Sequence, residues 1–194
     1  MIDSYKNMSS NTMDNLNSFI LQQVIKKRSR FSEGTIQDQK HQKDHFKNLV
    51  QHIGKISDGQ AIVSYDDANF RNFDVTITPK DGPYEHGKFP FHFKLHKSYP
   101  TSPPQIVCGK KVYHPNIDDE GEICLSTLSE WSVQYNDLLD CVQGLLFILQ
   151  NPNLDDPFSP YFAPGENVDE FLKNVKTSMQ GGEVYGTHFD NICI

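Results

Sequence analysis

The middle of the chain alternates apolar and polar residues, and this alternation constrains the fold more than any other feature. Every second residue is apolar from Phe73 to Thr78 and again from Phe89 to Leu95, which is the period of a strand with one buried face. Shorter apolar segments cover 61–65 and 106–108, and prolines between 100 and 104 exclude a strand there. We therefore expect an antiparallel meander of three strands that a fourth, at an edge, extends.

Helical periodicity precedes and follows these strands. In the segment 35–53, the apolar residues at positions 46, 49, 50 and 53 share one helical face, and Ser57-Asp58-Gly59 breaks the pattern. A second helix, capped by Asp137 and ended by Asn151-Pro152, is predicted from the helical spacing of Leu138, Leu139, Val142, Leu145, Leu146 and Leu149. Its apolar surface is wide, so we expect it to be buried against the sheet.

A last helix is predicted over residues 168–179, where Gly181-Gly182 ends it. The residues expected on one side of this helix are Phe171, Leu172, Val175 and Met179. The order helix, four strands, then helices predicts an α+β fold with segregated layers.

The length of 194 residues suits one domain with a tail. Residues 1–34 are rich in Ser, Asn, Lys and Arg, and we expect a flexible arm there and one domain over 35–194. Residues 1–57 carry nine Lys/Arg against five Asp/Glu, and residues 58–194 carry nine against twenty. A basic arm on an acidic body can steer toward a partner or can simply be a soluble extension. So acidic a body argues against a nucleic-acid partner.

The four cysteines, at 108, 124, 141 and 193, form no CxxC pair, which favours free thiols in a reducing, intracellular compartment. Cys108 and Cys141 fall on a strand and a helix, and we expect both in the core. A zinc site built from these two with His114 and Cys124 lacks the paired spacing of such sites, so no metal is expected. No apolar stretch approaches the ~18 residues of a membrane helix, so no membrane partner is expected either.

Cys124 is the candidate nucleophile, eight residues after Asn116 in a segment with a turn-forming Pro-Asn and a glycine. A thiolate can carry an acyl group as a thioester, and the Asn116 carboxamide can donate to the oxyanion that forms when a thioester is attacked. The alternatives are a packing cysteine and an asparagine that bonds its own backbone in a turn. His114 and Pro115 are expected to structure the loop, His114 through side-chain-to-backbone bonds.

Several separated motifs resemble those of ubiquitin-conjugating enzymes over about residues 35–194. They are Tyr99-Pro100 with Pro103-Pro104, His114-Pro115-Asn116, Gly121 to Leu125, Trp131-Ser132, and Asn151 to Pro157. The C-terminal pattern from Phe171 to Phe189 is similar to the end of the neddylation-type, NEDD8-carrying members of that family.

The resemblance implies the ubiquitin-conjugating fold and a transferase activity. The chain would accept a ubiquitin-like modifier, NEDD8, on Cys124 from its activating enzyme and pass it to a lysine of a protein such as a cullin. The resemblance also implies Asn116 as the oxyanion donor and Asp156 as the carboxylate that orients the incoming amine, although Asp156 could instead be a turn or capping residue. The activating enzyme would consume ATP, and this chain would bind no cofactor. A RING-type ligase and a cytoplasmic and nuclear location are expected with this activity.

The arm carries further candidates under the same resemblance. In the neddylation subfamily a start such as Met1-Ile2 can be acetylated and docked by a scaffold ligase. Apolar arm residues dock on the activating enzyme, and Phe19, Ile20 and Leu21 are the candidates for that role here.

Other functions stay open. The modifier could be ubiquitin itself, or the chain could be a non-catalytic scaffold of the same fold, whose usual signature is a missing cysteine, whereas Cys124 and Asn116 are both present. A zinc-dependent or papain-like hydrolase lacks the required spacings and the order Cys then His.

Overall fold

The computed structural model describes residues 39–162 and 167–193. The chain forms two units, Met1–Lys40 and His41–Ile194, and the described strands all belong to the second. The expected arm, residues 1–34, lies outside the described residues, as do the docking candidates Met1, Ile2, Phe19 and Leu21. No helix in the described part is long and apolar enough to cross a bilayer.

The first described element is a helix that continues to residue 56. Its predicted apolar face is confirmed, because Phe46, Leu49 and Ile53 are buried and Val50 is half-buried against the core. Asp58 follows the helix with a φ of 51°, a left-handed value that redirects the chain into the first strand.

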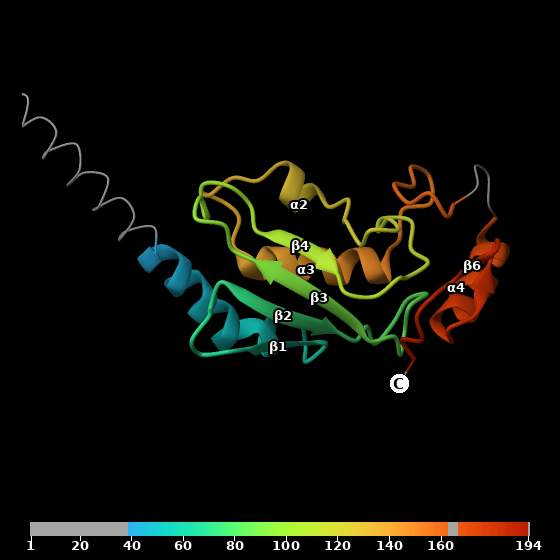
Figure 1. The fold of residues 1–194 in the computed structure, drawn as a ribbon, viewed down its shortest axis with the longest axis horizontal. Helices are drawn as coiled ribbons and strands as arrows, with labels where there is room; N and C mark the ends of the chain where they lie inside the picture. The colour runs from blue at the N-terminus through green and yellow to red at the C-terminus, as the bar shows by residue number, and fades with distance from the viewer. Residues whose placement is uncertain (1–38, 163–166, 194) are drawn as a thin grey trace, which may run out of the picture. The chain divides into compact units, whose positions relative to one another are not determined.

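Four antiparallel strands form one sheet in the order β1-β2-β3-β4 (Figure 1). Their bounds are Ala61–Tyr65 for β1, Asn72–Ile77 for β2, Phe89–Lys94 for β3 and Gln105–Cys108 for β4. This is the predicted meander with its fourth strand at an edge. On β2, Val75 lies opposite both Val63 and Phe91, and successive side chains alternate between the two faces. One face of the sheet is therefore apolar.

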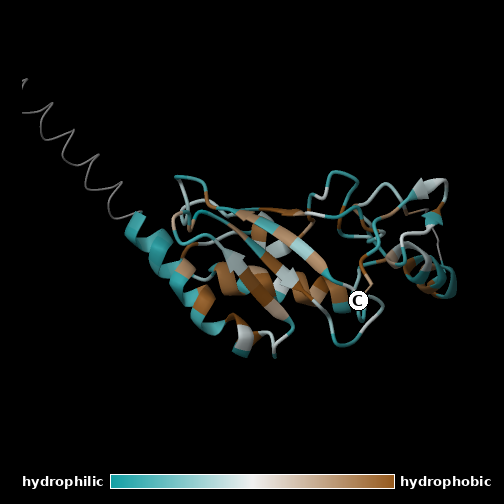
Figure 2. Ribbon diagram, turned by 60° about the horizontal axis from the view of Figure 1, so that its bottom comes forward, coloured by the Kyte–Doolittle hydropathy of each residue, from teal (hydrophilic) through white to brown (hydrophobic). Residues whose placement is uncertain are grey.

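Helix α3, Leu138–Gln150, lies along that apolar face (Figures 1 and 2), and Figure 2 shows hydrophobic residues concentrated on α3 and on the strands. Val142, Leu145 and Leu149 are fully buried. The predicted cap is confirmed: the Asp137 side chain accepts from the backbone N–H groups of Leu139 and Asp140. The buried face and the cap together position α3, and His114, in the segment that follows β4, bonds the Ile148 carbonyl in the last turn of α3.

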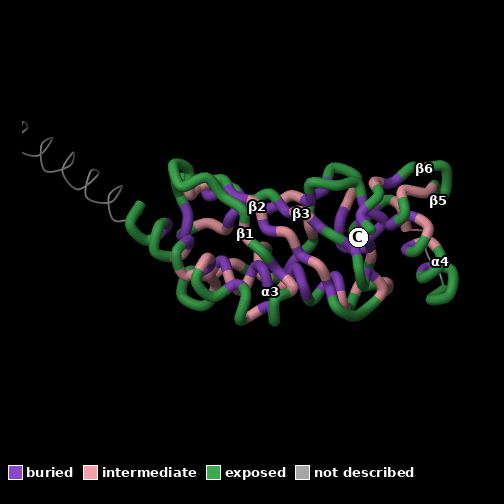
Figure 3. Tube along the Cα trace, turned by 90° about the horizontal axis from the view of Figure 1, so that it is seen from below, coloured by how far each residue is buried: buried purple, intermediate pink, exposed green. Residues whose placement is uncertain are grey.

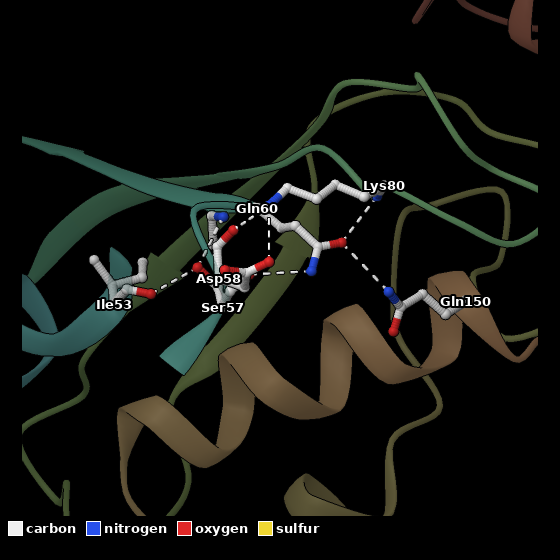
Figure 4. A network of polar contacts seen from close by, with 7 residues as sticks. Ile53, Ser57, Asp58, Gln60, Lys80 and Gln150 are labelled. Carbon is white, nitrogen blue, oxygen red and sulfur yellow. Dashed lines mark hydrogen bonds and ion pairs between the residues drawn. The ribbon is translucent and has the colours of Figure 1, made fainter. Parts of the chain in front are cut away.

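A polar network around Gln60 joins the first helix, the sheet and α3 (Figure 4). Gln60 Oε1 accepts from the Lys80 backbone N–H at 2.8 Å and from Gln150 Nε2 at 3.3 Å, and Gln60 Nε2 donates to the Ser57 carbonyl at 3.1 Å. Lys80 Nζ lies 2.9 Å from Asp58 Oδ2. That ion pair is exposed, so we expect it to contribute little to stability.

Helix α4, Val168–Met179, has the predicted bounds. Phe171, Val175 and Met179 are buried, but the prediction that Leu172 lies with them is wrong, since Leu172 is 44% exposed. Each helical residue is rotated about 100° from the last, so position 172 lies at the margin of the face, on the side of the exposed Val168. Figure 3 shows the outer side of α4 as exposed.

Three short elements lacked a sequence signal. Helix α2 covers Ser126–Ser129, and a hairpin pairs β5, Glu183–Val184, with β6, Thr187–His188. Tyr185 and Gly186, between these strands, both have positive φ, 51° and 80°, as a two-residue hairpin turn requires. Elements of two to four residues are too short for a periodic pattern.

Candidate active site

The segment 114–124 folds as a compact loop against β4. Ile117 pairs with Ile123 and is fully buried, and the Cys108 N–H donates to the Gly121 carbonyl at 2.8 Å. At Gly121 φ is +82°, and a Cβ there would lie 2.5 Å from the Cys108 carbonyl oxygen. The sequence therefore needs glycine at 121 for both conformation and close approach.

Cys124 presents its thiol to solvent from this loop. Its backbone N–H donates to the Asn116 carbonyl at 2.9 Å, and the next residue, Leu125, is buried and anchors the chain before α2. Cys108 and Cys141 are buried, as predicted, and burial raises the pKa of both thiols, that of Cys108 to about 11. Because the thiolate is the nucleophile, the two core thiols are unsuited to acyl transfer and Cys124 is accessible for it.

Asn116 is buried, and in the part of the chain that the structure describes one hydrogen bond orients its carboxamide. The Asn153 backbone N–H donates to Asn116 Oδ1 at 3.1 Å, so the oxygen end faces residue 153 and the NH₂ group is the opposite end. Within residues 39–162 and 167–193, the Asn116 side chain makes no other hydrogen bond. Asn116 therefore has two links to this site. Its backbone carbonyl accepts from the Cys124 N–H, and its side-chain NH₂ group is left to donate to a ligand.

His114 is fully buried and both of its ring nitrogens are engaged. Nδ1 accepts from the Asn116 N–H at 2.9 Å, and Nε2 donates to the Ile148 carbonyl on α3 at 3.1 Å. The ring stacks on Tyr84 with centroids 4.7 Å apart. Burial lowers the pKa of His114 to about 3, so the ring is neutral at pH 7. A general base needs a free ring nitrogen and access to the proton, and this histidine instead ties the loop to α3.

Asp156 is exposed on a short loop that is anchored at both ends on the 114–116 segment. Asn153 bonds Asn116 at one end, and at the other end the N–H groups of Phe158 and Ser159 donate to the Pro115 carbonyl at 2.8 and 3.0 Å. Among the described residues, no hydrogen bond or ion pair joins the Asp156 carboxylate to Cys124 or Asn116. The structure therefore brings together the loops of the three candidates and joins Cys124 to Asn116 directly.

Asn153 is the residue of this site that the sequence analysis missed. Its side-chain Oδ1 accepts from the backbone N–H of Asp155 at 3.1 Å and of Asp156 at 3.4 Å. An asparagine two residues before a polar pair is a known turn signal, so this turn could have been found from the sequence. The contact with Asn116, 37 residues earlier, could not.

The described residues bring together no group of three or more His, Cys, Asp or Glu side chains that could hold a metal ion. Of the four residues weighed for a zinc site, Cys108, His114 and Cys141 are buried and Cys124 is exposed. His114 has no free ring nitrogen for a ligand bond.

Comparison with known proteins places this geometry in context. A family model described as "Ubiquitin-conjugating enzyme" matches residues 44–179. The chain is 41% identical over 125 residues to the NEDD8-conjugating enzyme UBC12 of Yarrowia lipolytica, a match that covers 63% of this chain and 70% of the relative. It is 40% identical over 122 residues to the Nedd8-conjugating enzyme UbcE2M of Drosophila melanogaster, covering 61% and 67%.

Among solved structures, the fold is similar to that of S. cerevisiae Ubc12, with a TM-score of 0.63, 28% identity, and coverage of 89% of this chain and 97% of that one. It is also similar to a putative ubiquitin conjugating enzyme from Plasmodium yoelii, with a TM-score of 0.58, 28% identity, and coverage of 67% and 87%.

Proposed function

This chain belongs to the ubiquitin-conjugating enzyme family, and on that basis we propose that it carries NEDD8 as a thioester on Cys124 and transfers it to a lysine of a target protein such as a cullin. The observation that supports this most directly is that Cys124 is exposed while its backbone N–H donates to the Asn116 carbonyl. The relatives at about 40% identity named above carry NEDD8 in their names, and they support NEDD8 over ubiquitin as the modifier.

The first transfer is thioester exchange. The Cys124 thiolate attacks the carbonyl carbon of the modifier's C-terminal thioester on the activating enzyme, one C–S bond forms, the other breaks, and the activating enzyme's thiolate leaves. The bond type is the same before and after, so the free energies of the two thioesters are nearly equal and the exchange is reversible. The exposure of Cys124 is what this step requires of the chain.

The second transfer is aminolysis. The lysine nitrogen attacks the thioester carbonyl, a C–N bond forms, the C–S bond breaks, Cys124 leaves as thiolate, and the amine gives up a proton. Asn116 Nδ2 donates to the oxyanion of the tetrahedral stage, because its carboxamide is turned by the Asn153 bond so that the NH₂ group is available. Asp156 orients the amine and stabilises the positive charge that develops on its nitrogen, and the proton passes to Asp156 or to solvent.

The proposed partners are those that the family resemblance implies. The activating enzyme would supply the loaded modifier and consume ATP, so that this chain binds no cofactor of its own. A RING-type ligase would bring the charged chain to a cullin-like substrate. These partners, and a location in cytoplasm and nucleus where they operate, are part of the proposal.

A charging assay tests the proposal. With its activating enzyme, ATP and NEDD8, the chain should form an adduct that a reductant removes, and Cys124→Ala should abolish it. Cys193→Ser is the matched control, because Cys193 is the other exposed thiol among the described residues, and this variant should charge normally. A reducible adduct formed with ubiquitin and its activating enzyme but not with NEDD8 would show that the assignment of NEDD8 as the modifier is wrong. An adduct that survives in Cys124→Ala would contradict the assignment of the thiol.

A further inference from the structure

Asn153 makes two separate sets of contacts, one with its backbone and one with its side chain. The backbone N–H holds Asn116 Oδ1 at 3.1 Å. The side-chain Oδ1 accepts from the N–H groups of Asp155 and Asp156 at 3.1 and 3.4 Å. The side chain is itself exposed, so these contacts shape a surface turn and do not fill the core. One residue therefore links the amide donor of the site to the loop that carries the candidate carboxylate.

The Asp156 loop has few other restraints on this side. After Asn153 the chain continues through Leu154, which is half-buried against the core, and on to Pro157. The opposite end is fixed by the two bonds to the Pro115 carbonyl. A turn in which an asparagine oxygen accepts from backbone N–H groups two and three residues on is a defined local structure. Without that oxygen, the backbone at 155 and 156 loses both of its bonds.

We propose that Asn153 is a positioning residue for aminolysis: its side-chain oxygen fixes the backbone that carries Asp156 relative to Asn116. The inference rests on the proposed function, since it concerns the step in which a lysine attacks the thioester on Cys124. The lysine nitrogen forms the C–N bond, Cys124 leaves as thiolate, and the amine proton passes to Asp156 or to solvent. Asn153 itself touches neither the amine nor the thioester and acts through the geometry of Asp156.

The separation of backbone and side-chain roles allows a clean test. Asn153→Ala keeps the N–H that holds Asn116 but removes the acceptor for Asp155 and Asp156. Loading of Cys124 should proceed at the unchanged rate, and discharge to free lysine should slow about tenfold, a fraction of the ~10²–10⁴ that a positioned proton acceptor contributes. Asn153→Asp restores an acceptor oxygen at the same place and should recover most of the rate.

Two further variants separate positioning from simple loosening of the loop. In an Asp156→Ala background, Asn153→Ala should cost almost nothing more, because the two residues act as one unit. Asn151→Ala is the matched control: among the described residues its Nδ2 bonds the Phe147 carbonyl at the end of α3 and no other acceptor, and this variant should discharge at the unchanged rate.

The outcomes are distinguishable. A normal adduct that Asn153→Ala discharges at the unchanged rate would overturn the role of Asn153 alone. The role of Asn153 would also be overturned if the double variant slowed discharge by the product of the two single effects of Asn153→Ala and Asp156→Ala. A discharge rate in Asn153→Asp as low as in Asn153→Ala would overturn it too. If the unaltered chain forms no reducible adduct on Cys124, the proposed function falls and this role falls with it.

Discussion

At the scale of single residues, the site depends on which end of the Asn116 carboxamide is left to donate a hydrogen bond. Among the described residues, the Asn116 side chain makes one hydrogen bond, which its oxygen accepts from the Asn153 N–H, and this leaves the NH₂ group for a ligand. The same residue therefore both ties two loops and offers a donor. These two roles are separable by substitution.

Asn116→Ala removes both roles, and Asn116→Asp keeps the acceptor for Asn153 but has no N–H to donate. We expect both variants to load Cys124 at the unchanged rate. Both should discharge to lysine roughly 10²–10³ times more slowly, the usual cost of one oxyanion donor. Single-turnover loading and discharge assays measure the two steps separately. Parallel loss of loading and discharge would refute the oxyanion role. Near-normal discharge by Asn116→Asp would leave Asn116 with only its structural role, the hydrogen bond to the Asn153 N–H.

At the scale of an element, α3 depends on its N-terminal cap as well as on its buried face. Asp137 Oδ1 accepts from Leu139 N–H at 2.7 Å and from Asp140 N–H at 3.2 Å, and Asp140 Oδ2 accepts in return from the Asp137 N–H. Asn48 on the first helix donates to the other Asp137 oxygen at 3.3 Å. This cap thus joins two helices on the same side of the sheet.

Asp137→Ala should destabilise the chain by about 1 kcal/mol, a typical cost of losing such a cap, which for a chain of this size lowers Tm by roughly 2–4 °C. Thermal unfolding followed by circular dichroism measures it. Asp137→Asn keeps a side-chain oxygen that can accept from the first turn of α3, so its Tm should fall less than that of Asp137→Ala. An unchanged Tm in Asp137→Ala would mean that the buried face alone holds α3.

At the scale of the whole molecule, the buried His114 couples folding to pH. Burial lowers the pKa of His114 to about 3, whereas in the unfolded chain a histidine titrates near 6.5. Between these two values the unfolded state binds a proton that the native state does not. Stability therefore falls as pH drops from about 6.5 toward 3, by up to about 1.4 kcal/mol per pH unit from this one group.

His114→Asn should lower the free energy of unfolding at pH 7, because it loses the stacking on Tyr84 and a ring bond. As pH falls below 6.5, only the chain with His114 pays the protonation cost, so the difference between the two proteins should shrink. Urea unfolding at several pH values between 7 and 4.5 measures this difference. A difference that stays constant over that range would contradict a histidine buried in its neutral form.

Much of the fold could be predicted because its determinants are local and repetitive. The alternation at Phe73–Ile77 and Phe89–Phe93 follows from the geometry of a strand with one buried face, and the bounds of α4 follow from its spacing and the glycines after it. The prediction for Leu172 was wrong because spacing alone does not tell how wide a buried face is. The β5–β6 hairpin has two-residue strands, and it is held by the turn at Tyr185 and Gly186 and not by a pattern.

By itself the sequence determined the order of the four sheet strands and the longer helices, the apolar faces that they bury except for Leu172, and the candidate thiol, because these depend on period, composition and short motifs. Only the tertiary structure decided that His114 Nε2 reaches the Ile148 carbonyl on α3 and that the Asn153 N–H turns the Asn116 amide. Each of these facts joins residues far apart in the chain. Packing and hydrogen bonding across such separations depend on the folded geometry, which no local pattern encodes.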